Sequence, residues 1–160
     1  MRIMICAMGV AAVAASASAQ QFFQASDGTI SFSKAAFADP TDPANQDIIT
    51  DTVAITRDDI RGIYNIRQEG EYEDFFSPAG TQWFFGGTVQ DAHGGFPPGT
   101  VGVESVLYLE DIDAYVDITF TDWGSGGSGG AFAYDRAIIP APGSLALLGL
   151  GGLVATRRRR

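Results

Sequence analysis

The sequence predicts an all-β protein, an antiparallel, jelly-roll-like β-sandwich flanked by an N-terminal signal peptide and a short C-terminal transmembrane helix. Between the two apolar ends, apolar and polar residues alternate, and no stretch sustains a helical period. Gly, Pro, Asn and Asp residues separate the short apolar runs. Seven short strands divided by such turns are typical of sandwiches and jelly rolls.

The clearest strand runs from Ile112 to Thr121. An apolar residue occupies every second position from Ile112 to Phe120, and Asp, Tyr or Thr stands between them, so one face should point toward a core. The length of this strand predicts a central position in its sheet, paired with the preceding strand through a tight turn at Glu110 and Asp111. The other predicted strands are Thr29–Ser33, Thr52–Thr56, Gly62–Arg67, Gln82–Val89, Val101–Leu109 and Ala131–Ile138.

Three segments are predicted as loops by composition: Asp39–Asp47, Pro97–Gly99 and Gly124–Gly130. The last of these contains the glycine spacing of a dinucleotide-binding fingerprint. That motif needs a helix directly after the glycines, and here an alternating strand follows. The segment is therefore interpreted as a hairpin loop.

The first 19 residues have the pattern of a secretory signal peptide. One positive charge at Arg2 precedes an apolar stretch, and Ala17-Ser18-Ala19 supplies an A-x-A cleavage site ahead of Gln20. Signal peptidase and a secretion translocon are the implied partners. The single cysteine, Cys6, is removed with this peptide, which leaves the predicted mature protein without a thiol.

The last 21 residues combine a proline motif, an uncharged apolar run and a basic terminus. Pro140-Ala141-Pro142 precedes the proposed membrane segment 144–156, and Arg157, Arg158, Arg159 and Arg160 follow it. A helix from Pro142 to Thr156 would be roughly 22 Å long, shorter than the ~30 Å hydrocarbon layer of a membrane. It could span only if arginine side chains reached toward the head groups and the bilayer thinned locally. The arginines should remain cytoplasmic and act as the membrane stop.

This tail resembles the PEP-CTERM sorting signal of bacterial envelope proteins, in which a Pro-Glu-Pro-like motif, a membrane segment and an arginine cluster follow one another. Pro140 and Pro142 match its two prolines, and Ala141 stands where that family usually has Glu. The resemblance implies that an exosortase-like membrane protease recognises the motif. Two internal segments, Asn45–Ile66 and Ile118–Ala137, are similar to segments in many proteins that carry such tails.

The remaining region, residues 20–139, is predicted to be one acidic extracytoplasmic domain. It contains all 19 acidic residues of the chain and five basic ones, which gives it a formal charge of −14. This charge repels nucleic acid and anionic lipid head groups, so no nucleic-acid partner is expected.

No catalytic site is predicted. The sole histidine, His93, has neither a cysteine nor a second histidine as a partner, which argues against a hydrolytic triad. A two-carboxylate polysaccharide hydrolase remains an alternative. Its candidate acids are Asp111, Asp113, Asp117, Glu69, Glu71 and Glu73.

Two binding hypotheses remain for the domain. The oxygen-rich loop with Asp39, Asp42 and Asp47 is a candidate Ca²⁺ site, although it lacks the EF-hand pattern, and no other cofactor is expected. Aromatic residues on strands could form a platform for exopolysaccharide. These residues are Trp83, Phe84, Phe85, Tyr108, Tyr115 and Trp123.

Together these patterns predict an exported cell-envelope or extracellular-matrix protein with a non-catalytic structural or binding ectodomain. Before processing, the C-terminal helix would hold it in the membrane. After processing, the domain would lie at the surface or outside the cell.

Overall fold

The computed structural model of the chain describes residues 20–73, 76–85, 88–90 and 97–140. Within these residues the chain forms β-strands and short 3₁₀ turns, and no α-helix. The prediction of an all-β, mainly antiparallel protein is confirmed for this part. The strands are β1 (Gln21–Phe23), β2 (Thr29–Lys34), β3 (Asp47–Ile48), β4 (Ala54–Arg57), β5 (Ile63–Asn65), β6 (Thr81–Phe85), β7 (Thr88–Gln90), β8 (Glu104–Leu109), β9 (Ala114–Trp123) and β10 (Phe132–Ala137). The 3₁₀ turns are Ala25–Asp27, Pro43–Asn45 and Pro97–Thr100.

Seven strands form one large sheet in the order β2-β10-β9-β8-β6-β7, with β1 as an additional partner of β9. The first half of β9 pairs with β8 on one side and with β1 on the other, and its second half pairs with β10. The β1–β9 pair is parallel, whereas the other strand pairs of this sheet are antiparallel. The predicted central position of the longest strand is confirmed.

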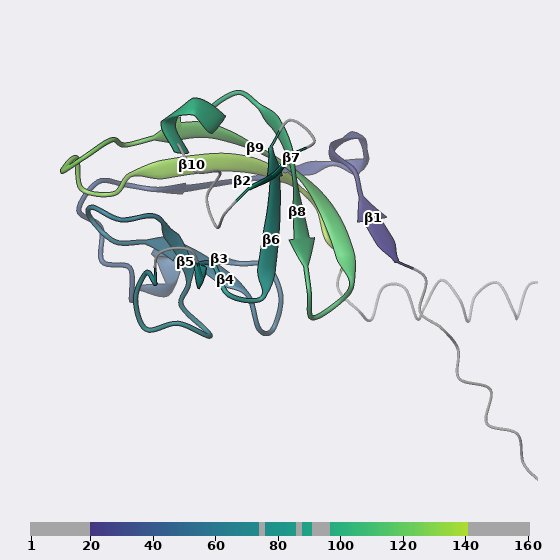
Figure 1. Ribbon diagram of the computed structural model, residues 1–160, viewed down its shortest axis with the longest axis horizontal. Helices are drawn as coiled ribbons and strands as arrows, with labels where there is room; N and C mark the ends of the chain where they lie inside the picture. Colours follow the sequence, from purple (N-terminus) through teal and green to yellow (C-terminus); the bar gives the residue numbers. More distant parts are fainter. Residues whose placement is uncertain (1–19, 74–75, 86–87, 91–96, 141–160) are drawn as a thin grey trace, which may run out of the picture.

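The remaining three strands form a small antiparallel sheet in the order β3-β4-β5, which lies beside one face of the large sheet (Figure 1). A single hydrophobic cluster fills the space between the two sheets. The small sheet and its turns contribute Ile49, Val53, Ile55 and Ile63, and the large sheet contributes Trp83, Phe85, Leu107, Leu109, Val116, Ile118, Phe120, Trp123, Phe132, Tyr134 and Ala137.

Strand alternation determines which residues reach this core. In β9, every second side chain from Ala114 to Phe120 is at most 2% exposed, while the residues between them face the outer side of the sheet. The turn predicted at Glu110 and Asp111 connects β8 to β9, and Asp113 within it has a φ of 48°. Aspartate tolerates this left-handed conformation better than most side chains do.

Two predicted strands differ clearly from the structure, and two observed strands were not predicted. The segment Gln82–Val89 is not one strand, because β6 and β7 pair with each other as a hairpin. Gly86 and Gly87 lie outside the described residues, but this pair is a turn signal that the prediction overlooked. β8 begins at Glu104 rather than at Val101. The short strands β1 and β3 were not predicted, because two or three residues are too few to show a period.

Candidate functional site

Strand alternation separates the aromatic residues that the sequence analysis grouped together. Trp83, Phe85 and Trp123 point into the core and are at most 9% exposed. Phe84, Tyr108 and Tyr115 are half-buried on the outer face of the large sheet. Only this second group is available for binding.

A fourth aromatic residue, Phe22 of β1, completes this outer group. The parallel pairing of β1 with β9 places Phe22 beside Tyr115, with ring centroids 5.1 Å apart and planes 12° from parallel. Tyr108 and Phe84 lie 4.8 Å and 6.2 Å from the same Tyr115 ring. The side chain of Phe22 is 64% exposed, so this cluster of four rings reaches solvent. The sequence analysis missed Phe22 because its strand is only three residues long.

Two adjoining hollows lie next to these rings on the same face of the sheet, and together we call them the outer groove. One has a volume of about 280 Å³ and the other of about 550 Å³, and Phe84, Val106 and Asp117 line both. The first is bounded by Phe22 and Tyr115. The second extends across the sheet to Asp135 of β10 and Thr29, the first residue of β2.

Three carboxylates line the outer groove: Glu104, Asp117 and Asp135. Oδ2 of Asp117 accepts a hydrogen bond from the backbone N–H of Ala25 at 3.0 Å, and Oδ1 of Asp135 accepts one from the Ser31 hydroxyl at 2.5 Å. These bonds orient two of the acids across the groove. Among the described residues that line the groove there is no Lys, Arg or His.

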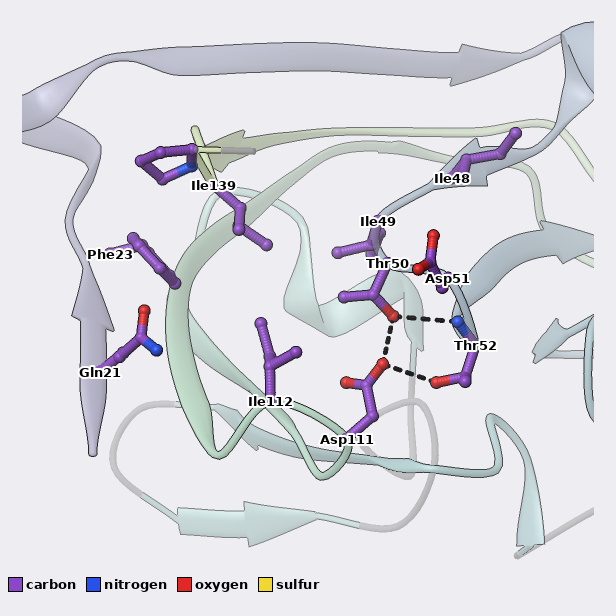
Figure 2. Close-up of a pocket in the computed structure, with 11 residues that line it drawn as sticks. Gln21, Phe23, Ile48, Ile49, Thr50, Asp51, Thr52, Asp111, Ile112 and Ile139 are labelled. Atoms are coloured by element: carbon purple, nitrogen blue, oxygen red, sulfur yellow. Dashed lines mark hydrogen bonds between the residues drawn. The ribbon is translucent and has the colours of Figure 1, made fainter. Parts of the chain in front are cut away.

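A separate cavity of about 650 Å³ opens at the end of the molecule where β1 begins and the described chain ends (Figure 2). Gln21 and Pro140 both line it, and its apolar wall includes Phe23, Ile112 and Ile139. The Asp111 carboxylate stands at its rim, where the hydroxyls of Thr50 and Thr52 donate to it at 2.5 Å and 2.6 Å. These bonds join the turn before β4 to the turn between β8 and β9.

Two of the acids considered for a hydrolase, Glu69 and Asp113, hold backbone and side-chain groups in place. Glu69 is 7% exposed and accepts from the backbone N–H groups of Asn65 and Ala79 at 2.7 Å and 2.8 Å, and from the Ser77 hydroxyl. Asp113 accepts from the Tyr108 hydroxyl at 2.9 Å, which raises the pKa of that phenol. Glu71 and Glu73 are exposed.

The candidate Ca²⁺ ligands have different surroundings. Asp39 accepts from the backbone and hydroxyl of Thr41, and Asp42 caps the 3₁₀ turn Pro43–Asn45 by accepting from the N–H of Ala44. The hydrogen bonds from Thr41 lower the pKa of Asp39. Over the described ranges, no group of three or more His, Cys, Asp or Glu residues is arranged to hold a metal ion.

Asp47, the third candidate ligand, is buried in an ion pair between the two sheets. Its carboxylate accepts from Nε and Nη2 of Arg136 at 2.7 Å and 2.9 Å, and from the Tyr134 hydroxyl at 2.7 Å. Burial alone would lower the pKa of Arg136, but the hydrogen bonds and charge of Asp47 outweigh it and raise that pKa. Burial, followed by the charge of Asp47, raises the pKa of Tyr134 well above its usual value.

The sorting and cleavage residues lie mostly outside the described chain. Ala17, Ala19, Ala141, Pro142 and the arginines 157–160 are all in the parts that the structure does not describe. Gln20 is described, and its side-chain amide donates to Asp113 at 3.2 Å. Among the described residues, no helix has the length and apolar character needed to cross a membrane.

No family model matches this chain, and no curated protein or solved structure is similar enough to count as a relative.

Proposed function

We propose that this protein is an exported cell-envelope or extracellular-matrix protein, processed and sorted through a PEP-CTERM-like signal at its C-terminus. In this proposal, residues 1–19 are a cleaved signal peptide and residues 140–160 are the sorting tail. The tail halts the chain in the membrane at Arg157–Arg160 until an exosortase-like protease acts near Pro140–Pro142.

The observation that carries this proposal is the shared position of Gln21 and Pro140 around one cavity. Gln21 is the second residue after the proposed signal cleavage site, and Pro140 is the first residue of the proposed sorting motif. Both membrane-directed segments would then leave the folded domain at the same end. That arrangement suits a domain that stands on the membrane with this end inward and is afterwards released by a single cut.

We further infer that the two sheets form a β-sandwich with a non-catalytic binding or structural role. Their common core supports the sandwich, and a strand near the start of the domain, β2, lies beside its last described strand, β10, which is a feature of jelly rolls. The consecutive neighbours β8, β9 and β10 form a meander, which departs from jelly-roll order. The bonds made by Glu69, Asp111 and Asp113 support a structural rather than a hydrolytic use of these acids.

The intact mass of the protein isolated from its native envelope tests the proposal. We expect the mature N-terminus at Gln20 and the C-terminus close to Pro142. A chain that still begins at Met1 would contradict export through a cleaved signal. A chain that still ends at Arg160 would contradict processing of the tail. A variant with all four arginines replaced by serine is the control. Because it lacks the residues that halt the chain in the membrane, we expect it to be released without passing through a membrane-bound precursor.

A further inference from the structure

The outer groove has the dimensions of an extended ligand rather than of a small molecule. It runs from Phe84 on β6, across β8, β9 and β10, to Thr29 on β2. Crossing four strand intervals at the usual spacing corresponds to roughly 19 Å, enough for about four pyranose rings in a row. Its two hollows adjoin at Phe84, Val106 and Asp117, which line both, so a ligand that occupies both contacts these three residues.

The register between neighbouring strands places apolar residues along one edge of the outer groove and acidic residues along the other. Tyr108, Tyr115 and Phe22 are direct neighbours in one row across β8, β9 and β1. Four residues further along the strands, Glu104, Thr119 and Asp135 form another row across β8, β9 and β10. The row that contains Val106 and Asp117 lies midway between these two. One ligand lying across the strands therefore meets aromatic rings along one edge and carboxylates along the other.

The negative charge of the outer groove indicates which kind of ligand it can bind. The part of the groove wall that the structure describes holds three carboxylates and no basic side chain, within a domain whose formal charge is −14. An anionic polymer would be repelled, while an ammonium group gains from the carboxylates and from exposed aromatic faces. Sugar rings pack their apolar faces against aromatic side chains, which a simple polyamine does not do.

We propose that the outer groove binds a cationic polysaccharide, a polymer of hexosamine units that carry free ammonium groups. The pyranose rings pack against Phe22 and Phe84, and the ammonium groups face Glu104, Asp117 and Asp135. This inference specifies the ligand of the binding role proposed above and does not depend on the sorting signal. Failure of tail processing would leave it unaffected.

Binding is measured by titration calorimetry on the full chain in detergent, at a mildly acidic pH at which the amino groups are protonated. The probe is a glucosamine oligomer of about five units, and the comparison probes are the fully N-acetylated oligomer of equal length and an oligolysine of equal charge. We expect the glucosamine oligomer to bind at least about tenfold more tightly than either, because only it offers both rings and charges.

Two variants with matched controls locate the site. Phe22→Ala should weaken binding about fivefold, while Phe76→Ala, which removes a ring that is 81% exposed elsewhere, should leave the affinity unchanged. The double variant Glu104→Gln and Asp135→Asn should weaken binding about three- to tenfold and reduce its salt dependence. Asp122→Asn, an exposed acid of β9 outside the groove, is its control.

Three results would overturn the proposal. Equal affinity for the N-acetylated oligomer would show that the ammonium groups are not recognised. Equal affinity for oligolysine would show that the groove responds to charge alone. If the groove variants and their controls behaved alike while all four remained folded by circular dichroism, the ligand would bind at another surface.

Discussion

At the scale of single residues, a buried polar group formed by Asp47, Tyr134 and Arg136 connects the two sheets. Asp47 belongs to β3 of the small sheet, and the other two belong to β10 of the large one. Two hydrogen bonds from the guanidinium and one from the phenol satisfy a carboxylate that water barely reaches. A buried charge with this many partners fixes the relative position of the two strands.

Asp47→Asn should lower the free energy of unfolding by about 3–5 kcal/mol, because it leaves the charge of Arg136 buried without its counter-ion. The measurement is urea unfolding followed by circular dichroism. Asp39→Asn is the matched control, since the Asp39 carboxylate accepts local hydrogen bonds from Thr41 in an exposed loop and its loss should cost at most about 1 kcal/mol. Similar midpoints for the two variants would mean that the ion pair is not important for stability.

At the scale of elements, the loop Gly124–Gly130 is held by a buried arginine from β4. Arg57 donates to the carbonyl oxygens of Gly124 and Ala131 at 3.0 Å and 2.9 Å, and its guanidinium lies 4.0 Å from the centre of the Trp123 ring. Burial lowers the pKa of Arg57 to about 10. The two strands flanking the loop are thus fixed by carbonyl bonds and by stacking, rather than by an acid.

Gly130→Ala should destabilise the protein by at least about 4 kcal/mol or prevent folding. Gly130 has a φ of +63°, and a Cβ there would lie 1.8 Å from the backbone oxygen of Asp58, so the loop and the chain after β4 would have to separate. Thermal unfolding checks this prediction. Gly127→Ala, which meets no atom within 4 Å, should shift the midpoint by only a few degrees at most. A Gly130→Ala protein as stable as this control would refute the close approach.

At the scale of the whole molecule, the two sheets share one core and should unfold together. The segments Asn45–Ile66 and Ile118–Ala137 meet through both of the buried arginine contacts described above, Asp47 with Arg136 and Arg57 with Trp123. All three strands of the small sheet lie in the first segment, and most of β9 and all of β10 lie in the second.

Ile55→Ala in β4 should therefore destabilise both sheets by the same amount, about 2–5 kcal/mol, because Ile55 is fully buried in the common core. Both tryptophans of the chain belong to the large sheet and lie in the common core, so their fluorescence reports on that sheet and on the core, while circular dichroism reports on all strands. We expect the two signals to shift together. Ile60→Ala, at a side chain that is 67% exposed, should change neither, and separate transitions in the Ile55→Ala protein would disprove a single cooperative unit.

The sequence determined the class of the fold and the longest strand. Apolar residues at every second position over ten residues are a local signal, because a strand that buries one face needs this alternation. The turn at Glu110 and Asp111 and the loop Gly124–Gly130 followed from local turn chemistry in the same way. Strands of two or three residues, such as β1 and β3, carry no period. They form only because a longer strand offers them backbone partners.

Only the tertiary structure decided which chemistry-bearing residues meet. Because alternate residues of a strand point to opposite faces of the sheet, Trp83 points into the core and Phe84 lies on the outer face. Pairing between distant strands placed Phe22 beside Tyr115. Asp47 resembled a loop acid in the sequence, yet its partner Arg136 is 89 residues away. Contacts of this kind depend on the register between sheets, and no local pattern of residues contains that information.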